Sequence, residues 1–64
     1  MKFKHNLKEL RIKKGITQKE LSKKLDISLE TVRRYEQGRA QPQSLEVLEK
    51  LTIILECDYN ELLK

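Results

Sequence analysis

The sequence predicts a small all-helical protein. Apolar residues recur at helical spacing along most of the 64 residues, and a residue that caps helices precedes each of these runs. The chain has one proline, Pro42, and two glycines, Gly15 and Gly38, which fall between helical stretches. No stretch shows the alternation of a β-strand. We therefore expect five helices in a single domain over residues 1–64.

The first helix is expected between Asn6, as its N-cap, and Gly15, which follows two lysines and ends it. Glu9 stands three residues after Asn6, which is the spacing of a capping box. Leu7 and Leu10 lie on one face and are assigned to the core.

The second and third helices are separated by only three residues, 26–28. Thr17 and Glu20 form a capping-box pattern at the start of the second helix, and Ser28 is expected to cap a third helix from Leu29 to about Gln37. The apolar residues of this pair are Leu21, Leu25, Ile27, Val32 and Tyr35. A turn this short does not allow a parallel hairpin, so the third helix should project outward.

The outward side of the third helix carries polar and charged residues. At about 100° per residue, three charged residues and one leucine share an arc of about 140°: Leu29, Glu30, Arg33 and Arg34. An exposed helix about 10–12 Å across fits the major groove of B-DNA, where base edges differ in their donors and acceptors. The arc is therefore a candidate surface for reading DNA.

The last two helices follow a loop from Gly38 to Gln43. Ser44 is expected to cap the fourth helix, whose inward residues are Leu45, Leu48, Leu51 (or Thr52) and Leu55. Asp58 and Glu61 show a second capping-box pattern at the start of the fifth. Leu62, and as a second choice Leu63, is expected to pack back on the core.

Charge is distributed unevenly along the chain, whose net charge is +4. Residues 1–39 hold 12 Lys and Arg against five acidic residues, a net +7, whereas residues 40–64 hold two against five, a net −3. A one-sided positive field favours a polyanion, because neutralised phosphates release counterions. Charge alone is equally compatible with an ordinary soluble surface.

Several classes of function are disfavoured. Cys57 is the only cysteine and His5 the only histidine, so no disulfide, metal site or cofactor is expected. Cys57 stands in an apolar run and is interpreted as a core residue. We expect no enzyme, because no set of nucleophile, base and orienting residue is present. No apolar stretch is long enough for a leader or membrane span, which predicts a cytoplasmic protein without membrane contact.

The stretch TQKELSKKLDISLETVRRYEQGRAQP resembles the helix-turn-helix of the Cro/cI-type (XRE-like) phage repressors. LKELRIKKG resembles the first helix of that family, and LEVLEKLTIILECDYNELL resembles its fourth and fifth. The resemblance covers nearly the whole chain. It implies a five-helix lambda-repressor-like DNA-binding domain that binds double-stranded DNA.

The resemblance also implies roles for individual residues. Base contacts fall on Leu29, Glu30 and Arg34, with Arg33 adjacent; phosphate contacts fall on Gln18, Arg39, Gln41 and Gln43; a structural ion pair falls on Arg11 and Glu36. Either arginine could donate to a guanine, Glu30 could accept from a cytosine amine, and Leu29 could contact a thymine methyl. Three alternatives stay open: Glu30 and Arg34 simply pair on the helix surface, Gln18 is an ordinary helix-start residue, and Leu29 packs beside the cap. The lysines Lys2, Lys4, Lys14, Lys19 and Lys23 are interpreted as a solvated surface that steers encounter.

Three departures from the family pattern stand out. Asp26 replaces the usual turn glycine, and Ser22 replaces a small apolar residue. Ile53 and Ile54 occupy positions that are more often polar or small, so one of them should remain near the surface and mark a partner surface. Phage repressors of this type dimerise near that end of the domain, which makes Ile53, Tyr59 and Leu63 the candidate dimer contacts on DNA.

Two functions follow as hypotheses. The first is a sequence-specific, double-stranded-DNA-binding transcriptional regulator, more a repressor than an activator because a bare DNA-binding unit blocks polymerase by occupancy. The second is an antitoxin or other protein-interaction module that uses the same fold to hold a protein partner, as the acidic C-terminal third suggests.

Overall fold

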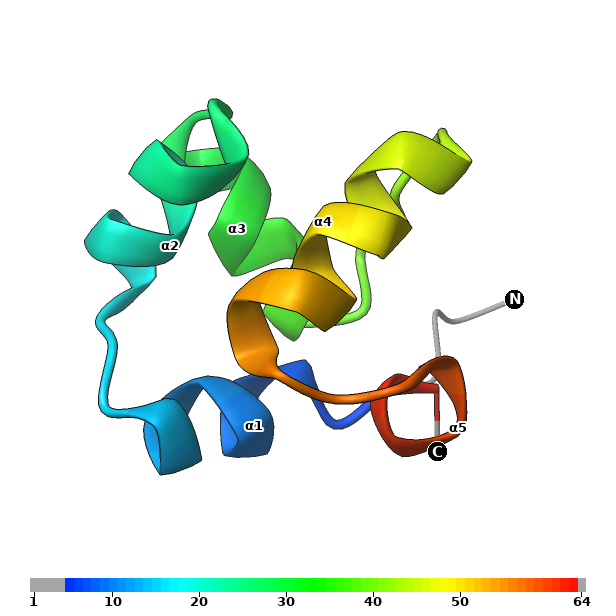
Figure 1. Ribbon diagram of the computed structural model, residues 1–64. Helices are drawn as coiled ribbons and strands as arrows, with labels where there is room; N and C mark the ends of the chain where they lie inside the picture. Colours follow the sequence, from blue (N-terminus) through cyan, green and yellow to red (C-terminus); the bar gives the residue numbers. More distant parts are fainter. Residues whose placement is uncertain (1–4, 64) are drawn as a thin grey trace.

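Five α-helices make up most of residues 5–63, the part of the chain described by the computed structural model. They are α1 (Leu7–Lys14), α2 (Gln18–Leu25), α3 (Leu29–Glu36), α4 (Leu45–Leu55) and α5 (Tyr59–Leu62). Figure 1 shows α2 and α3 on one side of the molecule, α4 beside α3, and the short α5 near α1. The predicted all-helical fold is confirmed, and no strand occurs in residues 5–63. Within that range no helix has the length and apolar character needed to cross a bilayer.

The core collects apolar side chains from all five helices. Its buried members are Leu7, Leu21, Leu25, Val32, Tyr35, Leu51, Leu55 and Leu62. The four core residues predicted for α2 and α3 are all buried, and Ile27, in the turn between them, is partly buried against the same cluster. Leu10 is also partly buried there. Because α2 packs on both α3 and α4, the apolar side of α3 is covered and its polar side remains outside.

The short turn between α2 and α3 is built as its residue types predict. Thr17 and Glu20 form a complete capping box at the start of α2, and a hydrogen bond from the Thr17 backbone lowers the pKa of the exposed Glu20 carboxylate. Asp26 ends α2 in the left-handed conformation, with φ 58° and ψ 45°. Ser22 is buried and donates its hydroxyl hydrogen to the Lys19 carbonyl at 2.7 Å. Ser28 then caps α3 by accepting from the Thr31 amide.

The start of α1 differs from the prediction. The Asn6 side chain makes no capping hydrogen bond, and no capping box with Glu9 is formed. The Asn6 backbone, at φ −121° and ψ 39°, lacks the extended conformation of the other four N-caps. The Leu7 amide instead donates to His5 Nδ1 at 3.0 Å, while the Asn6 amide donates to the Leu62 carbonyl at 3.0 Å. This last bond fastens the beginning of the domain to α5.

The assignment of Leu45 to the core is wrong. Leu45 is the first residue of α4 and is 77% exposed. At about 100° per residue it lies about 120° around the helix from Leu51, which is fully buried. Leu51 rather than Thr52 therefore occupies the central core position. Leu48 is only partly buried against the core.

The C-terminal end leaves several large apolar residues outside. Asp58 and Glu61 form the predicted capping box of α5, and Leu62 is buried whereas Leu63 is exposed. Ile54 packs against the core and Ile53 is 67% exposed, as the pair of isoleucines suggested. Cys57 is partly rather than fully buried against the core. An ion pair between Lys14 and Glu56 joins the ends of α1 and α4.

Candidate nucleic-acid interface

The outward side of α3, which begins directly after the turn, carries exposed charged residues. Glu30, Arg33 and Arg34 are exposed, while Val32 and Tyr35 are buried on the opposite side. Burial raises the pKa of the Tyr35 phenol, which holds that side chain in its neutral form within the core. Leu29, at the first position of α3, is partly buried. The four residues of the predicted arc thus share one side of the helix, with Leu29 partly turned toward the protein.

Two members of the arc pair with each other. Arg34 Nε lies 3.4 Å from Glu30 Oε2, and both side chains are more than half exposed. An exposed pair at this helical spacing contributes only about 0.2–0.5 kcal/mol, so a stronger partner displaces it readily. Both interpretations of Glu30, as a surface partner of Arg34 and as part of the reading face, agree with this geometry.

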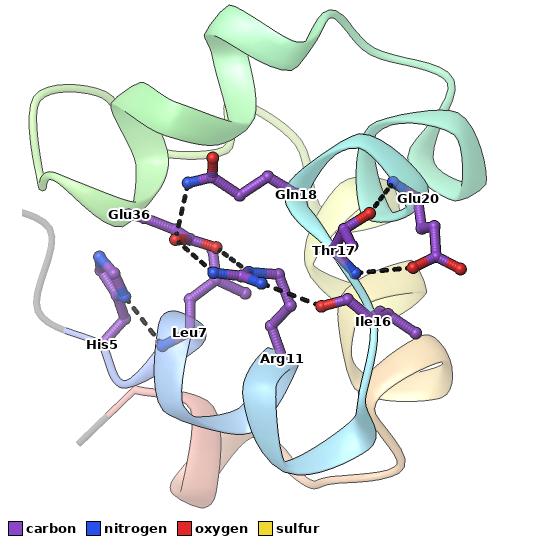
Figure 2. Close-up of polar contacts among 8 residues, drawn as sticks. All are labelled: His5, Leu7, Arg11, Ile16, Thr17, Gln18, Glu20 and Glu36. Atoms are coloured by element: carbon purple, nitrogen blue, oxygen red, sulfur yellow. Dashed lines mark hydrogen bonds and ion pairs between the residues drawn. The ribbon is translucent and has the colours of Figure 1, made fainter.

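One flank of the arc is a buried ion pair that holds Gln18. Arg11 Nε lies 2.6 Å from Glu36 Oε2, and the two side chains are 11% and 4% exposed. Arg11 also donates from Nη1 to the Ile16 carbonyl at 2.9 Å. Gln18 donates from Nε2 to Glu36 Oε1 at 3.0 Å (Figure 2). Gln18 is therefore tied to the end of α3 and is not a free helix-start side chain.

The other flank is the loop between α3 and α4. Arg39 is exposed, but its amide and that of Ala40 both donate to the Arg34 carbonyl, at 2.9 and 3.3 Å. These two amides end α3 and are occupied. Gln41 and Gln43 are exposed, and Gln43 Nε2 donates to the Gln41 carbonyl at 3.3 Å. The loop therefore offers the Arg39 guanidinium and the two glutamine side chains to a ligand, rather than its first amides.

The sequence model of the helix-turn-helix family matches residues 7–62, which span all five helices. The chain belongs to the Cro/cI-type (XRE-like) helix-turn-helix family. A comparison with curated proteins finds no match. Members of this family bind double-stranded DNA, and the chain is a DNA-binding transcription regulator in that general sense.

In this helix-turn-helix domain, α2 and α3 with their three-residue turn form the helix-turn-helix unit, and the arc lies on its second helix. The steering lysines fall in three groups. Lys19 and Lys23 are exposed on α2, and Lys14 is engaged by Glu56. Lys2 and Lys4 lie outside the described residues.

Two features of this interface were missed in the sequence. Gln37 is exposed and caps the C-terminus of α3 in a helical conformation, so it extends the arc by one turn beyond Arg33. Its spacing of four residues from Arg33 was the available signal. The hydrogen bond between Gln18 and Glu36 had no signal, because it joins residues 18 positions apart that meet only when α2 folds against α3.

The described residues offer little other chemistry. Within residues 5–63 no three His, Cys, Asp or Glu side chains gather closely enough to hold a metal ion. Burial, followed by the nearby carboxylates Glu61 and Asp58, raises the pKa of the Cys57 thiol and keeps it protonated at neutral pH. A protonated, partly buried thiol is a poor nucleophile, so the arc and its two flanks are the main candidate site.

Proposed function

We propose that this chain is a sequence-specific repressor that lays α3 in the major groove of double-stranded DNA. Arg33 and Arg34 are assigned to guanine O6 and N7, Glu30 to a cytosine amine, and Leu29 to a thymine methyl group. Binding of this kind blocks polymerase by occupancy alone. Each well-formed base contact would discriminate against a wrong base by about 1–3 kcal/mol.

The single observation that carries the proposal is the two-sided character of α3. Its apolar side is closed by Val32 and Tyr35 in the core, while three charged side chains remain exposed on the other side. The apolar side of α3 is already covered by the core, so only its charged side is available to a ligand. Its width and its donors and acceptors suit the major groove.

Phosphate contacts on both flanks would set the position of α3. We assign them to Gln18 on one side and to Arg39, Gln41 and Gln43 on the other. Of these four, Arg39 alone carries charge. Neutral donors orient the protein on the backbone, and a cation also releases counterions, so the two kinds of contact differ in their dependence on salt.

Selection from random duplexes tests the proposal. We expect enrichment of a short site, and we expect affinity for that site to fall about 10³–10⁵-fold between about 50 and 200 mM salt if about 6–10 phosphates are contacted. Weak binding without sequence preference at every salt concentration would contradict it.

We further propose that two copies bind DNA together through the exposed apolar residues of the C-terminal end, Ile53, Tyr59 and Leu63. A two-fold dimer would read two half-sites about 34–36 Å apart, and the selected site would be palindromic. Replacing Ile53 with Asp should abolish cooperative binding to both half-sites. Ile12→Asp is the matched control, because Ile12 is an exposed isoleucine on α1 that is not one of the proposed dimer contacts. Sedimentation of a strict monomer, free and on DNA, would overturn the dimer.

A protein-binding function, as in an antitoxin, is the second candidate. The exposure of Leu45 and Ile53 on α4 favours it, because large aliphatic residues on an acidic helix suit a protein partner better than DNA. The salt titration separates the two functions. A protein-binding module would bind duplexes weakly and without sequence preference.

A further inference from the structure

We propose that Glu36 is a positioning residue for DNA binding, which acts by fixing the side-chain amide of Gln18 against the phosphate backbone. The inference rests on the proposed function, since it concerns the phosphate contact assigned to Gln18. Glu36 itself is almost completely buried and does not reach the DNA surface. Its role would be carried by a single hydrogen bond, from Gln18 Nε2 to Glu36 Oε1 at 3.0 Å.

The charge of Glu36 decides how the Gln18 amide is turned. A carboxylate only accepts hydrogen bonds, so the amide must present its NH2 group to Glu36 and its oxygen away from it. Figure 2 shows this arrangement, with the amide nitrogen of Gln18 facing Glu36 and the oxygen on the far side. A flipped amide would place two acceptor oxygens about 3 Å apart, which is repulsive. Gln18 is thus held in one of its two orientations.

Glu36 is held rigidly enough to act as a support. Arg11 donates to both of its oxygens, from Nε to Oε2 at 2.6 Å and from Nη2 to Oε1 at 3.3 Å. The third bond of Arg11, to the Ile16 carbonyl, anchors the guanidinium to the segment just before α2. The Arg11 charge also neutralises the carboxylate, which would otherwise repel a phosphate bound near Gln18.

The fixed amide leaves one donor free for a ligand. Gln18 Nε2 carries two hydrogens, and Glu36 uses one of them. The capping box occupies the amides of Thr17 and Glu20, whereas those of Gln18 and Lys19, in the first turn of α2, have no acceptor within the helix. Gln18 and Lys19 therefore keep three donors without an acceptor in the helix: the second Nε2 hydrogen and two backbone amides. A DNA phosphate is the anion that the proposed function brings to this position.

A double-mutant cycle for DNA affinity tests the inference, with Gln18→Ala and Glu36→Gln as the two changes. The probe is a mixed-sequence duplex of about 20 base pairs, or about two helical turns, because a phosphate contact does not depend on sequence. Glu36→Gln makes the protein more positive by one charge, which by itself favours DNA binding. We expect the opposite, a loss of about tenfold in the wild-type background and no further loss in the Gln18→Ala background.

Stability is separated from positioning by two further variants. Glu36→Asp keeps the charge that Arg11 needs but withdraws the carboxylate from Gln18, and should show the same coupling if Glu36→Gln does not fold. Glu49→Gln removes one exposed negative charge on α4 and should leave affinity unchanged or slightly higher. Binding is measured at a temperature at which circular dichroism shows every variant folded.

The outcomes are distinct. Equal losses from the Glu36 change in both backgrounds, or tighter binding of Glu36→Gln, would overturn the positioning role and leave the proposed function standing. Failure of the wild-type protein to bind any duplex would overturn the proposed function as well. Loss of affinity only when Gln18 is present would support the inference.

Discussion

The helix-turn-helix unit, residues 17–38, and the C-terminal unit, residues 44–63, use their apolar residues differently. In the first unit the predicted core residues of α2 and α3 are buried, and the side chains left outside are mainly polar or charged. In the second, Leu45, Ile53 and Leu63 are exposed beside the buried Leu51 and Leu55. The first unit holds five basic and four acidic residues, a net +1, whereas the second holds one basic and five acidic residues, a net −4.

The difference shows how far a helical pattern constrains a surface. Where apolar residues are few, as in α3, their spacing allows one buried side and leaves the other free for a polar ligand. Where they are abundant, as in α4, the core takes some and the remainder stay exposed. The exposed apolar residues of α4 are therefore the observation that supports the proposed contact with another molecule.

The largest expected effect separates buried from exposed leucines of the same helix. Leu51→Ala should cost about 2–5 kcal/mol, because it opens a cavity in the core, and a domain of this size has little stability to spare. Leu45→Ala should change the free energy of unfolding by about 0.5 kcal/mol or less. Thermal denaturation followed by circular dichroism measures both. Similar losses from the two changes would mean that Leu45 is covered in solution.

The second effect concerns the reading face. Arg34→Ala should remove discrimination worth about 1–3 kcal/mol at one base position, because a bidentate contact with guanine is lost. Repeating the random-duplex selection with this variant identifies the position. Leu45→Ala serves as the control and should select the wild-type site. An unchanged preference in Arg34→Ala would remove Arg34 from the base contacts.

A substitution in the loop between α3 and α4 should act differently from a substitution in the arc on α3. Arg39→Ala should weaken binding to all sequences alike, and the slope of log affinity against log salt should become shallower by about one unit, because one phosphate contact is lost. Affinity titrations at several salt concentrations, on selected and shuffled duplexes, give the slope. If Arg39→Ala altered the preferred sequence, Arg39 would be a base contact.

The smallest expected effect is a change in the free energy of unfolding when the N-cap residue of α2 or of α1 is replaced. Thr17→Ala should destabilise the domain by about 1 kcal/mol, because it removes the side-chain acceptor of a complete capping box. Asn6→Ala should have almost no effect or stabilise slightly, since the Asn6 side chain makes no cap and its buried oxygen has no hydrogen-bond partner among the described residues. Chemical denaturation resolves the pair. A larger loss for Asn6→Ala would show that its side chain does cap α1.

Much of the fold could be predicted because its signals are local. The capping residues Thr17, Ser28 and Asp58 act on amides three positions away, so short sequence patterns contain them. The prediction that Asn6 caps α1 was wrong because its backbone amide bonds to the Leu62 carbonyl, at the other end of the chain. The prediction that Leu45 lies in the core was wrong for a different reason. Its spacing from Leu48 and Leu55 is helical, but at the start of α4 it is exposed.

The candidate site likewise has one part that local sequence patterns predict and another that depends on the packing of the helices. The arc on α3 follows from helical periodicity, and the pairing of Glu30 with Arg34 was among its predicted alternatives. The support beneath Gln18 required the packing of α1, α2 and α3 around one buried carboxylate, which no local pattern contains. Family resemblance indicated Arg11 with Glu36, but it did not connect that pair to Gln18.

If α3 reads base sequence in the major groove, the protein must distinguish two duplexes that differ only in the order of their bases. The wild-type protein is titrated at physiological salt with its selected duplex and with a shuffled duplex of the same composition. We predict that the selected duplex binds about a thousandfold more tightly, or more, as specific DNA-binding proteins do. Equal affinity for the two duplexes would show that α3 does not read base sequence.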